Sequence, residues 1–94
     1  MSHLLGGWTK KDSPSSLKKA YSKPFYGMYN TSTQDAPSNY GFYFAFPMTQ
    51  PNGNENNGLV IAVQNDFTKL FINGSWGNSG YNSKWTEVSL IQQS

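Results

Sequence analysis

Few residues of this 94-residue chain could perform acid–base or nucleophilic chemistry. Cysteine is absent, and the single histidine is His3, beside the N-terminus. A Ser-His-Asp arrangement would have to take its imidazole from that position. Without thiolates or clustered imidazoles, a metal site would need carboxylates gathered from separate loops. No Gly-rich phosphate loop lies between a predicted strand and a helix, so we expect neither a metal nor any other cofactor.

The remaining catalytic candidates are two carboxylates, Asp66 and Glu87, which could act together on a glycosidic bond. Asp66 falls in a tight connection between two predicted strands, where Asp is a common turn residue. Glu87 falls in an alternating strand, at a position that faces solvent. These structural roles account for both residues, and we predict that the protein is not an enzyme.

The composition favours binding instead. Charged residues make up 13% of the chain, against about 25% in a typical globular domain, and aromatic residues make up 16%. Tyr and Trp supply rigid contact area while Asn, Ser and Gly supply adaptable hydrogen bonds, a combination typical of paratopes and sugar sites. An ordinary β-rich extracellular protein would have a similar composition. The predicted ligand-binding residues are Tyr40, Tyr43, Asn57, Trp76, Asn78, Tyr81 and Asn82.

Positive charge is concentrated near the N-terminus, where residues 1–23 hold five of the seven lysines. Arginine is absent from the whole chain. Because Arg makes the bidentate contacts to phosphates and bases, we predict no role in nucleic-acid binding. No apolar run approaches the roughly 20 residues that cross a bilayer, and no signal peptide opens the chain. We therefore expect no membrane insertion and synthesis without secretion.

Two regions differ in their pattern. Residues 1–24 are predicted to form a linker or attachment segment, in which residues 14–21 could form a short helix or stay extended. Residues 25–94 are predicted to form an all-β domain, a small antiparallel meander or sandwich of about five strands. The predicted strands cover residues 25–29, 40–46, 59–64, 67–72 and 84–90.

Within this domain, period-two alternation places Phe42, Phe44 and Phe46 on one face of a strand. The expected core is that row together with Leu59, Ile61, Val63, Phe71 and Val88. The Asn73-Gly74 step predicts a turn, and the polar loops 52–57 and 77–83 are candidate binding loops. A chain this small, with no disulfide available, is expected to oligomerise, and three copies around an axis would cover its second aromatic face.

Residues 25–91 resemble the knob domain of phage tail fibres and pyocin-type bacteriocins. In that family a strand leads to a turn of the form Asn-Gly-Ser/Thr-Trp, which is similar to residues 73–76 here, and a second Trp and a final strand follow, as at residues 84–88. Residues 25–29 and 36–41 resemble the family's first strand and its Pro-containing loop. The family commonly places its two tryptophans close together, whereas Trp76 and Trp85 are separated by an inserted loop. An Arg that often precedes the family's turn is also missing.

The resemblance implies a virion component, the receptor-binding tip of a phage tail fibre. Such a protein would be a homotrimer, made in the host cytoplasm and attached to other virion tail proteins. It would act at the host cell surface during adsorption, by carbohydrate binding to bacterial surface polysaccharide or to another envelope receptor. Two alternatives stay open. One is a structural virion component, such as a fibre or baseplate connector or a decoration protein, without receptor binding. The other is a fragment of a depolymerase or lysin.

Overall fold

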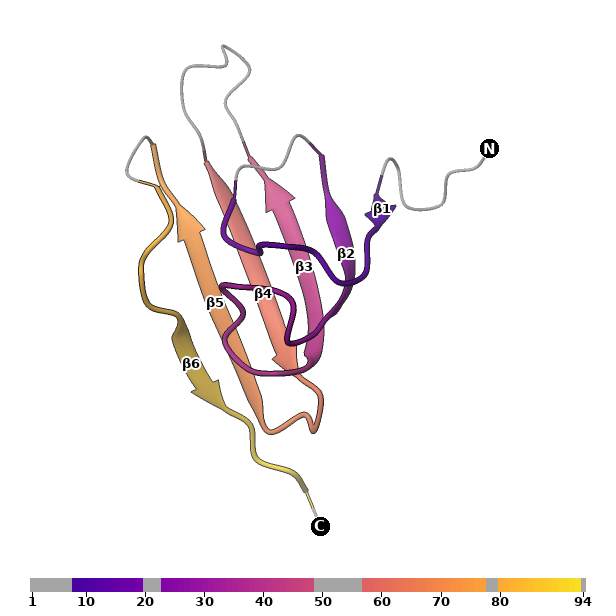
Figure 1. Ribbon diagram of the computed structural model, residues 1–94. Helices are drawn as coiled ribbons and strands as arrows, with labels where there is room; N and C mark the ends of the chain where they lie inside the picture. The colour runs from indigo at the N-terminus through magenta and orange to yellow at the C-terminus, as the bar shows by residue number, and fades with distance from the viewer. Residues whose placement is uncertain (1–7, 20–22, 49–56, 78–79, 94) are drawn as a thin grey trace.

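The computed structural model describes residues 8–19, 23–48, 57–77 and 80–93, which form one sheet of six strands (Figure 1). The strands are β1 (Thr9–Lys10), β2 (Phe25–Tyr29), β3 (Gly41–Pro47), β4 (Gly58–Gln64), β5 (Lys69–Ser75) and β6 (Thr86–Ser89). They lie side by side in chain order. β1 pairs with β2 in parallel, and the other neighbours are antiparallel. The predicted all-β fold is confirmed.

The N-terminal segment contributes to this sheet. Thr9 and Lys10 pair with the start of β2, which adds a short sixth strand to the expected five. Residues 14–19 form no helix, and the rest of the possible helix lies outside the described residues. Leu17 from this segment is fully buried against the sheet. No helix in the described part of the chain is long and apolar enough to span a membrane.

One face of the sheet, called here the covered face, lies beneath two irregular segments, residues 11–19 and 30–40, which cross in front of the strands in Figure 1. These segments bind each other, because Thr33 Oγ1 donates to the Pro14 carbonyl at 2.6 Å and the Gln34 amide to the Ser15 carbonyl at 3.0 Å. The buried core between segments and sheet consists of Leu17, Tyr29, Tyr43, Ala45, Val60, Ala62 and Phe71.

The expected core is therefore on the wrong face, with Phe71 as the one shared residue. Phe42 and Phe44 keep 39% and 38% of their surface exposed, and Val88 is exposed as well. An irregular segment lies close to a sheet only where side chains are small and polar groups can bind its backbone. Gly27 meets this need, since a Cβ there would stand 2.4 Å from the Lys11 carbonyl oxygen. Tyr43 donates its hydroxyl hydrogen to that oxygen at 2.6 Å.

The carboxylate of Asp35 fixes the two covering segments to each other. It accepts hydrogen bonds from Ser16 Oγ at 2.5 Å and from the amides of Leu17 at 2.7 Å and Lys18 at 2.9 Å. Burial alone would raise the pKa of Asp35, but these hydrogen bonds outweigh it and hold the pKa below its ordinary value. Trp85 Nε1 donates to the Asp35 carbonyl at 2.9 Å, which ties the chain after β5 to the same point.

The opposite face of the sheet is called here the open face. Its residues are Tyr26, Met28, Phe42, Phe44, Phe46, Leu59, Ile61, Val63, Leu70, Ile72 and Val88. Trp8 packs at one corner, with its ring centroid 5.0 Å from that of Phe46. The most exposed large hydrophobic side chains of the strands, Met28 and Val88, belong to this face. The fold thus has one face closed by its own chain and one that meets solvent.

Candidate functional site

The predicted ligand-binding residues stand at two opposite ends of the sheet. Gly41 pairs with Gln64 at one end, and Gly58 pairs with Ser75 at the other. Tyr40 therefore lies at the first end and Trp76 at the second, separated by the length of a seven-residue strand, roughly 20 Å. The two residues cannot contact one small ligand.

Tyr43 lies in neither place, because it is fully buried under the covering segments. Burial, together with the nearby Asp12 carboxylate, raises the pKa of Tyr43 to about 12. The Tyr43 hydroxyl donates to the Lys11 carbonyl, so this predicted ligand-binding residue lines no exposed site. Asn78 lies outside the described residues.

A shallow hollow of about 380 Å³ lies between the end of β5 and the chain that leads to β6. It brings together two of the predicted residues, Trp76 and Asn82, and is called here the Trp76 hollow. The Trp76 side chain keeps 84% of its surface exposed. The described residues that line the hollow include no charged side chain, and they are Gly58, Leu59, Ile72, Asn73, Gly74, Ser75, Trp76, Gly80, Asn82 and Thr86.

The strand register creates this hollow. β5 and β6 pair as far as Ile72 and Thr86, after which β5 continues alone along β4 to Ser75. The connection from β5 to β6 therefore stands away from the end of β5. Gly77, with φ of 65°, adopts the left-handed conformation that glycine tolerates best, and this turns the chain away directly after Trp76.

The predicted turn at Asn73-Gly74 is wrong, since both residues lie inside β5. The buried Asn73 amide instead binds the connection to β6. Its Nδ2 donates to the carbonyls of Asn82 at 3.0 Å and Lys84 at 3.2 Å, and its Oδ1 accepts from the amide of Asn82 at 3.0 Å and of Gly74 at 2.7 Å. A side chain thus replaces the strand pairing that ends at Ile72, and it holds one wall of the hollow.

Two further side chains support the same connection. Asn57, a predicted ligand-binding residue, is buried, and its Oδ1 accepts a hydrogen bond from the Gly77 amide. Lys18 Nζ donates to the carbonyls of Asn82 at 3.2 Å and Ser83 at 3.1 Å. Asn57 therefore positions the backbone beside Trp76 rather than lining the hollow.

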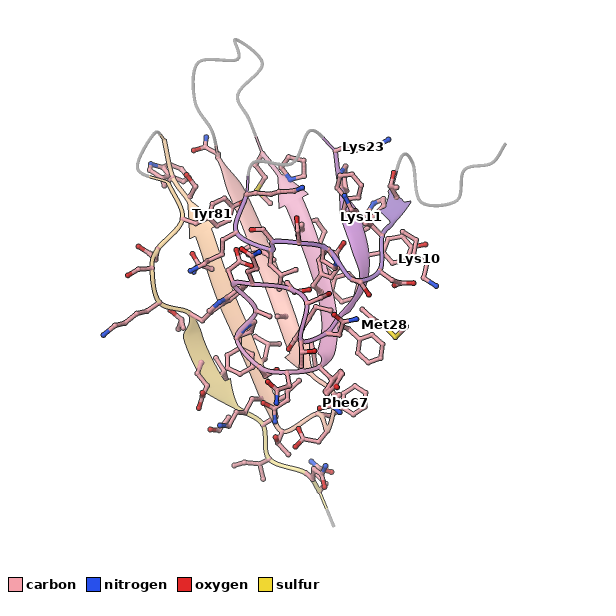
Figure 2. All side chains as sticks on the ribbon, in the orientation of Figure 1. Lys10, Lys11, Lys23, Met28, Phe67 and Tyr81 are labelled. Atoms are coloured by element: carbon pink, nitrogen blue, oxygen red, sulfur yellow. The ribbon has the colours of Figure 1, made fainter. Side chains whose placement is uncertain are left out.

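Tyr81 also has a supporting role. It lies on the connection between β5 and β6 (Figure 2), and its half-buried ring packs against the core, as the ring of Trp85 also does. Burial raises the pKa of Tyr81 above its ordinary value. A Cβ at Gly58 would stand 2.6 Å from the Tyr81 hydroxyl, so glycine makes room for this ring. The side chain anchors the wall of the hollow to the sheet.

The two candidate carboxylates are placed in structural contacts. Asp66 Oδ1 accepts hydrogen bonds from Thr68 Oγ1 at 2.7 Å and Gln64 Nε2 at 2.9 Å in the turn between β4 and β5. These bonds lower the pKa of Asp66, whereas a general acid needs a raised one. Glu87 lies 3.7 Å from the Lys69 ammonium. The described residues include no group of three His, Cys, Asp or Glu that could hold a metal ion.

The prediction missed aromatic residues on the open face. Phe67 has a φ of 61°, which costs a non-glycine residue about 1–2 kcal/mol, and 55% of its surface is exposed. Its ring stacks on Phe42 with centroids 6.0 Å apart. A hollow of about 260 Å³ beside this pair includes Tyr40. The strict alternation of Phe42, Phe44 and Phe46 is the sequence signal for this face, but alternation alone does not show whether a face is buried or exposed.

Comparisons of the chain with models of protein families, with curated proteins and with solved structures give no match. The geometry of the Trp76 hollow therefore carries the functional argument.

Proposed function

We propose that this chain is a carbohydrate-binding domain and that the Trp76 hollow is its binding site. The observation that carries the proposal is the exposed Trp76 indole at the rim of a hollow whose described lining is uncharged. Trp is enriched in binding surfaces because its rigid ring supplies a large contact area at a low cost in conformational entropy.

The lining suits a neutral, hydroxyl-rich ligand. The indole offers a flat apolar surface for the C–H face of a sugar ring, and Leu59 and Ile72 give the hollow an apolar base. Asn82 and Thr86 add polar groups to the same lining. The hollow is at the small end of the range for ligand sites, about 300–1,000 Å³, which favours one or two sugar rings of a longer chain.

The biological setting follows from the resemblance of residues 25–91 to the knobs of tail fibres. We infer that the chain is the receptor-binding tip of a phage tail fibre and that its ligand is a polysaccharide of the bacterial surface. Support comes from the position of the hollow at one end of the strands, on a connection fixed by Asn57, Asn73 and Lys18. Rigid sheets that carry a binding connection at their end are a common arrangement for recognition.

The test is binding of the full chain to an array of purified bacterial surface polysaccharides. We expect the wild-type chain to bind at least one neutral glycan and Trp76→Ala to weaken that binding at least tenfold, about 1.4 kcal/mol. Tyr40→Ala is the matched control, because it removes an exposed aromatic ring at the other end of the sheet. Equal losses in both variants, or no loss in Trp76→Ala, would contradict the proposal.

A second candidate is a structural virion component without receptor binding. The open face favours it, since an apolar sheet face suits an interface with another protein. A chain that binds no glycan on the array yet assembles with virion tail proteins would support this second function instead.

A further inference from the structure

We propose that a second hollow, at the opposite end of the sheet from Trp76, binds a small quaternary or methylated ammonium group. The site is the hollow of about 260 Å³ that includes Tyr40, called here the Tyr40 hollow. Figure 2 labels Met28, which lines this hollow, and Phe67, whose ring stacks on Phe42. Among the described residues, none lines both the Tyr40 hollow and the Trp76 hollow. The proposal therefore does not depend on the carbohydrate site.

The hollow lies where β2 ends and β3 begins, because Tyr29 pairs with Gly41 at that point. Gly41 makes room for the Tyr29 ring, since a Cβ there would stand 2.5 Å from the Tyr29 hydroxyl oxygen. That hydroxyl forms a hydrogen bond of 2.6 Å with Ser38 Oγ. The carbonyl of Tyr40 accepts a hydrogen bond from the amide of Asn65 at 3.1 Å. The backbone that carries these rings is therefore held in place before a ligand arrives.

Aromatic rings and a thioether line the hollow. The residues that supply them are Tyr29, Tyr40, Phe42 and Met28. Tyr40 keeps 52% of its surface exposed, and Phe42 is stacked on Phe67 with the ring planes 19° apart. The face of an aromatic ring is negative and attracts a cation that lies within about 6 Å of the ring centroid. This lining therefore favours a cation with an apolar surface, which methyl groups on a nitrogen provide.

The charge of the hollow has the matching sign. Asp12 is the one charged side chain among the described residues that line it. Its Oδ1 accepts a hydrogen bond from the Met28 amide at 2.9 Å, which holds the carboxylate at the hollow. Lys10 Nζ lies 3.6 Å from the other oxygen of Asp12, but both side chains are exposed, and surface ion pairs of this kind are weak. The carboxylate can therefore attract a cation that enters the hollow.

Backbone strain gives an independent sign that this end of the sheet is used. Among the described residues, the non-glycine residues with positive φ are Ser13, at 54°, and Phe67, at 61°. Ser13 lines the hollow, and Phe67 stacks on Phe42, which also lines it. Glycine or asparagine adopts such a conformation more easily. Because strained residues cluster at ligand sites, their convergence here supports a binding role.

The size of the hollow fits a small ligand. Its volume is below the range of about 300–1,000 Å³ that is typical of ligand sites, so it suits a single compact group. A trimethylammonium group on a short chain, as in choline, is of this kind. Aromatic residues around a cation are the usual means by which proteins recognise choline and methylated lysine. The same cation can be free or linked to a phosphate, as in phosphocholine.

The test is a titration of the full chain with choline, followed by calorimetry and NMR. We expect saturable binding, and binding of dimethylbutanol, the uncharged analogue in which carbon replaces the nitrogen, should be at least about tenfold weaker. A parallel titration uses phosphocholine. Tighter binding of phosphocholine than of choline would assign a phosphate-linked group as the ligand, and weaker binding would assign the free cation.

Variants locate the binding. Tyr40→Ala should weaken choline binding by about tenfold, whereas Tyr40→Phe keeps the ring and should bind as the wild-type chain does. Asp12→Asn removes the charge but keeps an oxygen for the Met28 amide, so we expect binding at least about threefold weaker. Trp76→Ala is the matched control, since it removes an exposed ring at the other end of the sheet and should leave choline binding unchanged.

Far-ultraviolet spectra that match the wild-type spectrum show that the variants fold. The proposal would be overturned if neither choline nor phosphocholine bound, or if the uncharged analogue bound as tightly as choline. Equal losses in Tyr40→Ala and Trp76→Ala, or in Tyr40→Ala and Tyr40→Phe, would also overturn it. A neutral glycan carries no cation, so the result of the glycan array would not change with any of these outcomes.

Discussion

The two faces of the sheet are built from different side chains, although both are apolar. The covered face combines Gly27, Ala45 and Ala62 with tyrosines whose hydroxyls bind the covering segments, as Tyr43 does with Lys11. The open face carries the large Phe, Ile and Val side chains. Small residues let the chain close upon itself, whereas large ones leave a surface for other molecules. We therefore expect the covered face to contribute more than the open face to the stability of a single chain.

The largest expected effect comes from truncating two neighbouring residues of β3, one on the covered face and one on the open face. Tyr43→Ala removes a fully buried ring, and we expect the free energy of unfolding to fall by about 3–5 kcal/mol. Phe44→Ala, one residue further along β3, removes a part-exposed ring and should cost clearly less at concentrations where the chain is monomeric. Urea denaturation measures both changes. Equal losses would mean that the open face belongs to the core of a single chain.

A smaller loss of stability is expected when the Asp35 carboxylate, which joins the two covering segments, is neutralised. Asp35→Asn weakens the hydrogen bonds that the side chain accepts from Ser16, Leu17 and Lys18. Because a hydrogen bond to a charged group contributes about 1.5–3 kcal/mol, we expect the free energy of unfolding to fall by about that amount. Because the folded pKa of Asp35 is depressed below 3.8, this contribution is present above the unfolded pKa and is lost as pH falls through the folded pKa.

The measurement for Asp35 is the free energy of unfolding between pH 6 and pH 2, compared between the two chains. The wild-type chain should lose stability below about pH 4 more steeply than Asp35→Asn. Parallel curves would show that the carboxylate does not hold the covering segments together.

The smallest expected loss of stability concerns the support of the Trp76 hollow. Asn73→Ala removes the bonds to Asn82 and Lys84 and should cost about 1–2 kcal/mol, since only part of the connection is released. Hydrogen exchange of the amides at residues 80–85 should rise, while those of β3 keep their protection. Uniform exchange across the sheet would mean that Asn73 stabilises the whole fold and not this connection.

The sequence predicted the strands well and the faces poorly, for a physical reason. β2 has the predicted bounds, and β3 and β4 differ by one residue or less at each end, because alternation and flanking turn residues are local signals. Alternation shows that a strand has two faces but does not show which is covered. That choice depends on long-range contacts such as Tyr43 with Lys11 and Asp35 with Leu17.

The candidate site shows the same limit. Of the predicted ligand-binding residues, Trp76 and Asn82 line one hollow, because both belong to the connection between β5 and β6. Tyr40 lies at the far end of the strands, and Asn57 and Tyr81 support the hollow from behind. Local preference predicts a turn at Asn73-Gly74. In the fold, the Asn73 side chain instead makes hydrogen bonds to the backbone of Asn82, on the connection to β6. Tertiary hydrogen bonding overrides turn preference there.

The most direct test of the carbohydrate site is an NMR titration that follows the three indole N–H signals of the chain. The probe is the neutral glycan that binds most strongly on the polysaccharide array. The account predicts that the Trp76 signal shifts with added glycan while that of Trp85, held by Asp35 against the core, stays in place. A shift confined to Trp8 on the open face, or none at Trp76 with a glycan that binds, would contradict it.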